Sequence, residues 1–220
     1  MNPTAFDPVA LILLLAGLAL LPLLLVCTTS FLKINIVLMI VRNALGVQQV
    51  PPAMAINGMA LAATLFVMAP VFNQMAQRLQ PESGAAAIGQ ASGPLNLARL
   101  AHAAEPLRDF MVANTLPERR QTFLELARRQ WERTSMTPQE TDYVVLIPCF
   151  VVSELELAMK AGFVLYVPFV VIDLLLSNVL LALGMQMVSP MVVSLPLKLL
   201  LFVMLDGWAR LFDGLVRSYA

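Results

Sequence analysis

Six charged side chains are spaced through the otherwise apolar last third of the chain, and they are its main candidates for chemistry. They are Glu154, Glu156, Lys160, Asp173, Lys198 and Asp206. A charge at the centre of a membrane helix costs about 2.5 to 3.5 kcal/mol even on the milder insertion scales. Because lipid tails cannot solvate these groups, we expect their side chains to contact protein, water or one another.

Two of these charges have a local explanation that competes with a functional one. Glu156 and Lys160 are four residues apart, which places them on one face of a helix and predicts an ion pair. Asp173 lies between Ile172 and Leu174, and an isolated carboxylate in such a run suggests a proton relay. We favour a hydrogen-bond partner between helices or between subunits, because a carboxylate rarely stays unpaired in apolar sequence.

The sequence gives no support for catalysis, for a metal site or for a cofactor. His102 is the only histidine, and Cys27 and Cys149 lie in apolar runs without CxxC spacing, which is typical of buried free cysteines. The chain has no GxxxxGK[ST], HExxH or GxSxG motif. We therefore predict no catalytic residue, no metal and no cofactor, so that the protein is not an enzyme.

The composition is that of a membrane protein. Hydrophobic residues make up 59% of the 220 residues and charged residues 13%, against about 45 to 50% and about 25% in soluble domains. The formal net charge is zero and the arginines form no single basic stripe, which argues against a nucleic-acid partner.

Hydrophobic periodicity and breaks predict an all-α chain in three parts. Residues 1–77 form an N-terminal hydrophobic helical hairpin, with an uncleaved first helix that is bent or locally loosened at Pro22 and a break at the Pro51-Pro52 pair. Residues 78–142 are a polar helical insertion, and residues 143–220 are a C-terminal hydrophobic hairpin whose arms are 161–183 and 191–208. Lys33 and Arg42 mark a cytoplasmic connection, so we expect the insertion to face the periplasm.

Several long motifs resemble one family. They are SFLKINIVLMIVRNALGVQQVPP (30–52), MAPVF (68–72), EPLRDFM (105–111), IPCFVVSELELAMKAGF (147–163), VPFVVIDLLLSNVLLALGMQMVSP (167–190) and LPLKLLLFVMLDGW (195–208). These segments closely resemble the FliP/SctR family, the core export-gate subunits of bacterial flagella and of type III secretion injectisomes. The resemblance covers nearly the whole chain, and the Val47-Gln48-Gln49-Val50 segment is more similar to the injectisome branch.

The resemblance implies a pore-forming scaffold in the bacterial inner membrane, with much of the assembly on the periplasmic side. About five copies would join two smaller hydrophobic export-apparatus subunits in a helical, cone-shaped hetero-oligomer. Larger export-gate and switch proteins would be further partners, and unfolded secreted proteins would pass through the centre. The six charges would then be paired between hairpins or subunits.

The family's constriction corresponds to the turn at residues 184–190. Flagellar members have three consecutive methionines where this chain has Met185, Gln186 and Met187. Flexible thioethers can exclude water from a pore and still deform around a passing segment, so the resemblance implies a pore gasket here. The simpler interpretation is that the two methionines fill gaps in a helical hairpin.

A second hypothesis is a small ion-coupled transporter or channel. Glu154, Asp173 and Lys198 would be its conduction or coupling sites, as polar residues in apolar helices often are. The absence of an inverted repeat in the sequence argues against this hypothesis.

Overall fold

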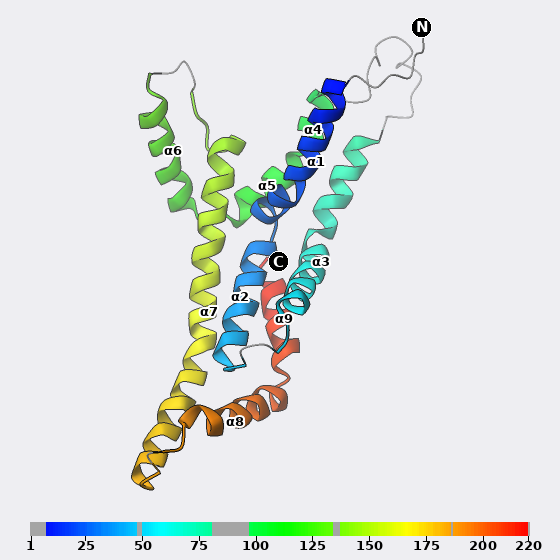
Figure 1. Cartoon of the computed structure of the whole chain (residues 1–220). Helices are drawn as coiled ribbons and strands as arrows, with labels where there is room; N and C mark the ends of the chain where they lie inside the picture. Colours follow the sequence, from blue (N-terminus) through cyan, green and yellow to red (C-terminus); the bar gives the residue numbers. More distant parts are fainter. Residues whose placement is uncertain (1–7, 48–49, 81–96, 134–136, 186, 220) are drawn as a thin grey trace, which may run out of the picture.

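The computed structural model describes residues 8–47, 50–80, 97–133, 137–185 and 187–219. Within these ranges every regular element is a helix, which confirms the predicted all-α class (Figure 1). The helices form an elongated molecule, with the long helix α7 along one side and α8 crossing its lower part (Figure 1).

The N-terminal part begins with α1 (Pro8–Thr28) and α2 (Phe31–Ala44), which are bent by 68° relative to each other. The bend lies between Thr28 and Phe31, whereas the sequence predicted it at Pro22, which α1 accommodates. The hydroxyls of Thr28 and Thr29 donate to the carbonyls of Leu24 and Leu25 at 2.7 and 2.6 Å. Such bonds to the preceding turn compete with the backbone ladder and bend helices.

Helix α2 is the centre of the main hydrophobic core. Its residues Ile34, Val37 and Val41 are almost fully buried. They pack with Ile56 and other residues of α3 (Ala53–Leu79), and with residues of α7 and α9. The core therefore joins the N-terminal part to the C-terminal part of the chain.

The described part of the polar insertion contains three short helices. These are α4 (Leu97–Ala103), α5 (Glu105–Asn114) and α6 (Pro117–Trp131). Pro106 and Pro117 stand at the starts of α5 and α6, where a missing amide costs nothing. Helix α5 contacts both α3 and α7, and Met111 forms a small second core with Leu146 and Phe150.

The C-terminal part differs in detail from the predicted hairpin. Helix α7 (Tyr143–Ala182) is continuous over 40 residues through Pro148 and Pro168, so the predicted arm 161–183 is only its second half. The return arm is split into α8 (Pro190–Met204) and α9 (Gly207–Arg217), bent by 62°. Leu211 and Leu215 bury one face of α9 against the main core.

Among the described residues, two helices, α3 and α7, are long and apolar enough to cross a membrane. The number of candidate spans rises to four if each bent helix pair, α1–α2 and α8–α9, is counted as one span. Large apolar side chains are exposed on several helices, including Met54 at 85%, Val192 at 71% and Met204 at 75%. Exposed apolar surface of this extent requires lipid or partner proteins.

Candidate functional site

The turn between α7 and α8 places the predicted gasket at one tip of the molecule (Figure 1). Gly184 has φ of +73°, a left-handed conformation that suits glycine. The amide of Gly184 donates to the carbonyl of Leu181 at 3.0 Å, and that of Met185 donates to the carbonyl of Leu180 at 2.9 Å. This pair of bonds is a Schellman motif, which ends α7 and fixes the position of Met185.

The two described methionines of the turn are exposed in the single chain. Met185 is 45% exposed and Met187 is 102% exposed. Gln186 lies outside the described residues. Methionine side chains that contact so little of their own chain are available for contacts with other molecules.

Glu154 is fully buried where α7 meets α2, α5 and the C-terminal end of the chain. The hydroxyl of Tyr219 donates to Glu154 Oε2, and Lys33 Nζ lies 4.0 Å from the centre of the Tyr219 ring. That ring also stacks on Phe110, with centroids 5.8 Å apart. Sequence analysis missed Tyr219, because nothing in its spacing indicates proximity to a residue so distant in the chain.

Lys198 and Asp173 join three helices. Lys198 Nζ lies 2.6 Å from Asp173 Oδ2 and donates to the carbonyl of Ala44 at 3.2 Å. Lys198 is 4% exposed, whereas Asp173 is half-buried. The pair therefore fixes α7 and α8 to the C-terminal end of α2.

Glu156 forms a third set of contacts, on the side of α7 that faces α6. Its Oε1 lies 2.8 Å from Lys160 Nζ, the ion pair that their four-residue spacing predicts. Its Oε2 lies 2.9 Å from Arg119 Nη2 on α6. Glu156 is half-buried and Lys160 is exposed, so these bonds dock the insertion on α7 in contact with solvent.

Asp206 lies at the corner between α8 and α9. Its side chain is exposed, and its backbone has φ of +50°, in the left-handed region. Among the described ion pairs none involves Asp206. The next residue, Gly207, packs directly under the Phe202 ring, where a Cβ atom would come within 2.4 Å of ring carbons.

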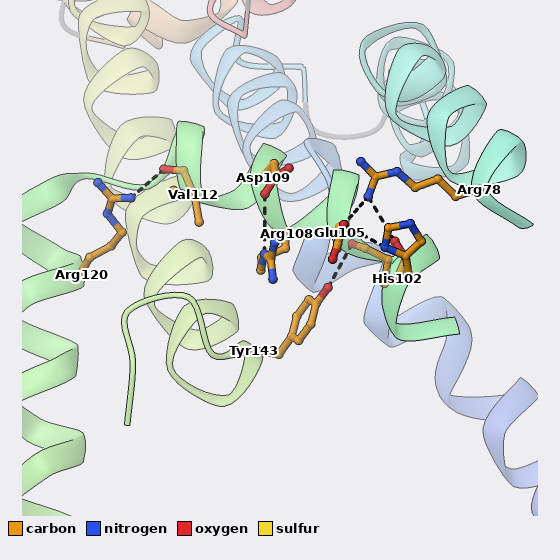
Figure 2. Close-up of polar contacts among 9 residues, drawn as sticks. Arg78, His102, Glu105, Arg108, Asp109, Val112, Arg120 and Tyr143 are labelled. Atoms are coloured by element: carbon orange, nitrogen blue, oxygen red, sulfur yellow. Dashed lines mark hydrogen bonds and ion pairs between the residues drawn. The ribbon is translucent and has the colours of Figure 1, made fainter. Parts of the chain in front are cut away.

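A polar network that sequence analysis did not identify holds the insertion to α3 (Figure 2). Arg78 Nη1 lies 2.6 Å from Glu105 Oε2 and donates to the carbonyl of His102 at 3.2 Å. His102 Nδ1 is 3.2 Å from the same carboxylate, and Tyr143 donates to the carbonyl of Ala104 at 3.0 Å. The hydrogen bond from His102 and then the charge of Arg78 lower the pKa of Glu105.

The described residues contain no group of three or more histidine, cysteine, aspartate or glutamate side chains that could hold a metal ion. Cys149 is buried and Cys27 is half-buried, and both are free.

The sequence matches a family model and several named relatives. The FliP family model matches residues 14–215. The chain is 51% identical over 221 residues to "Harpin secretion protein HrcR" of Erwinia amylovora, covering 100% of both chains. It is 44% identical over 214 residues to "Yop proteins translocation protein R" of Yersinia pestis, covering 97% of both. It is also 41% identical to "Virulence protein YscR" of Salmonella typhimurium, covering 97% of this chain and 98% of the relative.

Proposed function

This chain belongs to the FliP family, and we propose that it is a pore-forming scaffold subunit of a type III secretion export gate. Its relatives are type III secretion export-apparatus proteins. Unfolded substrate proteins would cross the bacterial inner membrane through the assembled pore. The protein would act as a structural component and not as an enzyme.

The observation that supports this proposal most directly is the α7–α8 turn. Met185 and Met187 lie in this turn with their side chains exposed, and the Schellman motif fixes the backbone at Met185. In a ring of about five copies, equivalent tips would meet around one axis. The methionines would then close the channel by excluding water, while their flexibility would allow a polypeptide to pass.

The contacts of the buried charges favour a scaffold over an ion-coupled transporter. Lys198 bonds to Asp173 and to a backbone carbonyl, and Glu154 accepts a bond from Tyr219. Such pairs hold helices together, whereas a conduction site needs charges that face a water-filled path. We propose that two smaller hydrophobic export-apparatus subunits, larger export-gate and switch proteins, and membrane lipid surround this scaffold.

A permeability measurement tests the gasket. Replacing both methionines, Met185→Ala and Met187→Ala, should leave the complex assembled but make the inner membrane leaky to small ions and solutes, because the alanines leave an open ring. The leak is measured by the collapse of an ion gradient in cells or in vesicles that contain the purified complex.

Met204→Ala is the matched control, because Met204 is also highly exposed but lies at the far end of α8. It should leave permeability unchanged. An assembled double variant that is as tight as the parent would refute the gasket.

A further inference from the structure

Helix α9 and the residues that follow it are attached to the rest of the chain along one narrow face. Trp208, Leu211, Leu215 and Tyr219 recur every three or four residues, so they lie on the same side. Among the described residues of α9, only Leu211 and Leu215 are buried. Trp208 is half-buried and meets the Phe202 ring edge-on, with centroids 5.1 Å apart. Few side chains therefore hold this helix to the core.

An apolar groove of about 820 Å³ lies between α9 and the helices α2 and α7. Val41 on α2, Val164 on α7 and Gly214 on α9 are among its lining residues. A Cβ atom on Gly214 would meet nothing within 4 Å. Side chains that border empty space lose the dispersion contacts that hold packed helices together. Helix α9 is therefore packed less tightly than α2, whose inward side chains are almost fully buried.

Tyr219 anchors the C-terminal end of this helix to three others. Its hydroxyl donates to Glu154 on α7, and its ring stacks on Phe110 of α5 with centroids 5.8 Å apart. The ammonium of Lys33 on α2 lies 4.0 Å from the centre of the same ring. One side chain thus makes all of these contacts, and without it only the apolar face of α9 remains attached.

The N-terminal end of α9 follows a sharp corner. Helices α8 and α9 are bent by 62° relative to each other, and only Leu205 and Asp206 separate them. The Asp206 side chain is exposed, and its φ of +50° is uncommon for a residue other than glycine. Hinges consist of a few such residues between elements, which absorb changes in φ and ψ. This corner is the point about which α9 would rotate as a unit.

The buried charges have a second possible arrangement that does not need Tyr219. Lys33 and Glu154 attract each other through space, although each contacts Tyr219. Glu154 Oε1 has no partner among the described residues. If Tyr219 withdraws, the ammonium of Lys33 can bond directly to the carboxylate. A buried charge that is left alone is strongly unfavourable, so this replacement lowers the free energy of the released state.

We propose that α9 is a strap that opens and closes on the core, with Tyr219 as its latch and the corner at Asp206 as its pivot. In the closed state Tyr219 donates to Glu154, and in the open state an ion pair between Lys33 and Glu154 replaces that bond. Opening uncovers the apolar walls of the groove. Because Phe110 belongs to the polar insertion, closure also depends on the docking of α5. The proposal requires neither the gasket nor export.

Hydrogen–deuterium exchange tests the latch on the full chain in its complex, purified in mild detergent and read by mass spectrometry. The amides of α9 should exchange faster than those of α2. Tyr219→Ala should speed exchange throughout α9 about tenfold and leave α2 unchanged, because only the strap opens more often. Arg217→Ala is the control, since Arg217 is exposed at the same end and pairs only with Asp213 of α9. It should leave exchange unchanged.

Lys33→Met tests the alternative ion pair. The closed state then loses a cation–π contact, whereas the open state loses the only partner of a buried carboxylate, and the second loss is the larger. Exchange of α9 should therefore slow about fivefold, although a contact of Tyr219 has been removed. Lys160→Met is the matched control, because Lys160 also lines the groove but is exposed and pairs with Glu156. It should have no effect on α9.

A second pair of variants tests the groove without changing any charge. Gly214→Ala and Gly214→Leu both raise helix propensity, but only leucine fills the empty space under the strap. Exchange of α9 should therefore slow more in Gly214→Leu than in Gly214→Ala. This comparison and Tyr219→Ala still decide the matter if Lys33→Met does not fold.

Three results would overturn the proposal. The first is exchange of α9 in the parent protein that is as slow as that of α2. The second is an equal rise of exchange in α2 and α9 of Tyr219→Ala, which indicates general destabilisation. The third is faster exchange of α9 in Lys33→Met, which indicates that no ion pair replaces the latch. Since none of these measures leakage, their outcome is separate from that of the methionine variants.

Discussion

At the scale of single residues, the Tyr219 hydroxyl has the clearest energetic role, because it is the partner of a fully buried carboxylate. The two oxygens of Glu154 differ: Oε2 accepts the bond from Tyr219, whereas Oε1 has no partner among the described residues. A charged or polar group that loses its only partner in the interior pays its full desolvation cost.

Tyr219→Phe should therefore destabilise the protein by about 1 to 3 kcal/mol, although it keeps the ring under Lys33 and against Phe110. The measurement is the thermal unfolding of the full chain in detergent. Tyr143→Phe is the matched control, because it removes a hydroxyl that donates to the neutral carbonyl of Ala104 in a half-buried position. It should cost about 0.5 to 1.5 kcal/mol.

If Tyr219→Phe lowered the free energy of unfolding no more than Tyr143→Phe does, the hydrogen bond to Glu154 would stabilise the protein no more than a bond to a neutral carbonyl.

Spacing alone could predict only part of this residue chemistry. The Glu156–Lys160 pair follows from a four-residue interval, and the unfavourable transfer of charge into lipid implies that Lys198 and Asp173 need partners. Which partners they have depends on which helices are neighbours, and a single sequence does not contain that information. The sequence does indicate that Lys33 needs a partner, because Lys33 is the single charged residue between Ser30 and Arg42 in an apolar run.

At the scale of helices, α2 and α7 approach each other closely at Gly162. A Cβ atom on Gly162 would be 2.3 Å from Ile40 Cδ1 and 3.3 Å from Ile40 Cβ. The absence of a side chain at Gly162 therefore lets the central helix of the core lie close against the longest helix.

Gly162→Leu should separate these helices and destabilise the protein by about 1 to 3 kcal/mol, as overpacking of a core does. The midpoint of thermal unfolding in detergent measures the loss. Ile40→Ala in the same chain should restore part of it, because the added side chain then has room.

Gly58→Leu on α3 is the control, since a Cβ atom at Gly58 meets nothing within 4 Å. It should be neutral or stabilising by up to about 1 kcal/mol, because leucine favours a helix more than glycine does. Equal destabilisation by Gly58→Leu and Gly162→Leu would mean that the α2–α7 contact is not especially tight.

Helix content was easier to predict than helix boundaries. The apolar runs and the change to polar composition after Arg78 indicate the all-α class, and α7 begins directly after the predicted insertion. The bend after Thr28 and the continuity of α7 through Pro148 and Pro168 were not predictable from propensity. The bend coincides with the bonds from the Thr28 and Thr29 hydroxyls to the preceding turn. The continuity of α7 persists although each proline removes one backbone bond.

At the scale of the whole molecule, the distribution of exposed apolar surface indicates an assembled protein. Met54 on α3, Val164 on α7 and Val203 on α8 are each more than two-thirds exposed. One chain therefore presents apolar side chains in several directions, and a bilayer covers only those at membrane depth.

The full chain should therefore co-purify in mild detergent in one large, stable complex with two other small hydrophobic proteins. Native mass spectrometry of the tagged chain measures the composition. Expression without those partners should yield heterogeneous or aggregated protein, because the interfaces stay uncovered. Recovery of a monodisperse, stable monomer would contradict the scaffold and would favour a transporter.

The backbone at the end of α7 does not depend on the methionine side chain that it displays. Gly184 and the bonds from the amides of Gly184 and Met185 determine its shape up to Met185, and no methionine side chain takes part in them. The chemical group at position 185 can therefore be exchanged while the end of α7 keeps its geometry. This position is a suitable attachment point for a photo-crosslinker or a fluorophore that records which molecules come near it.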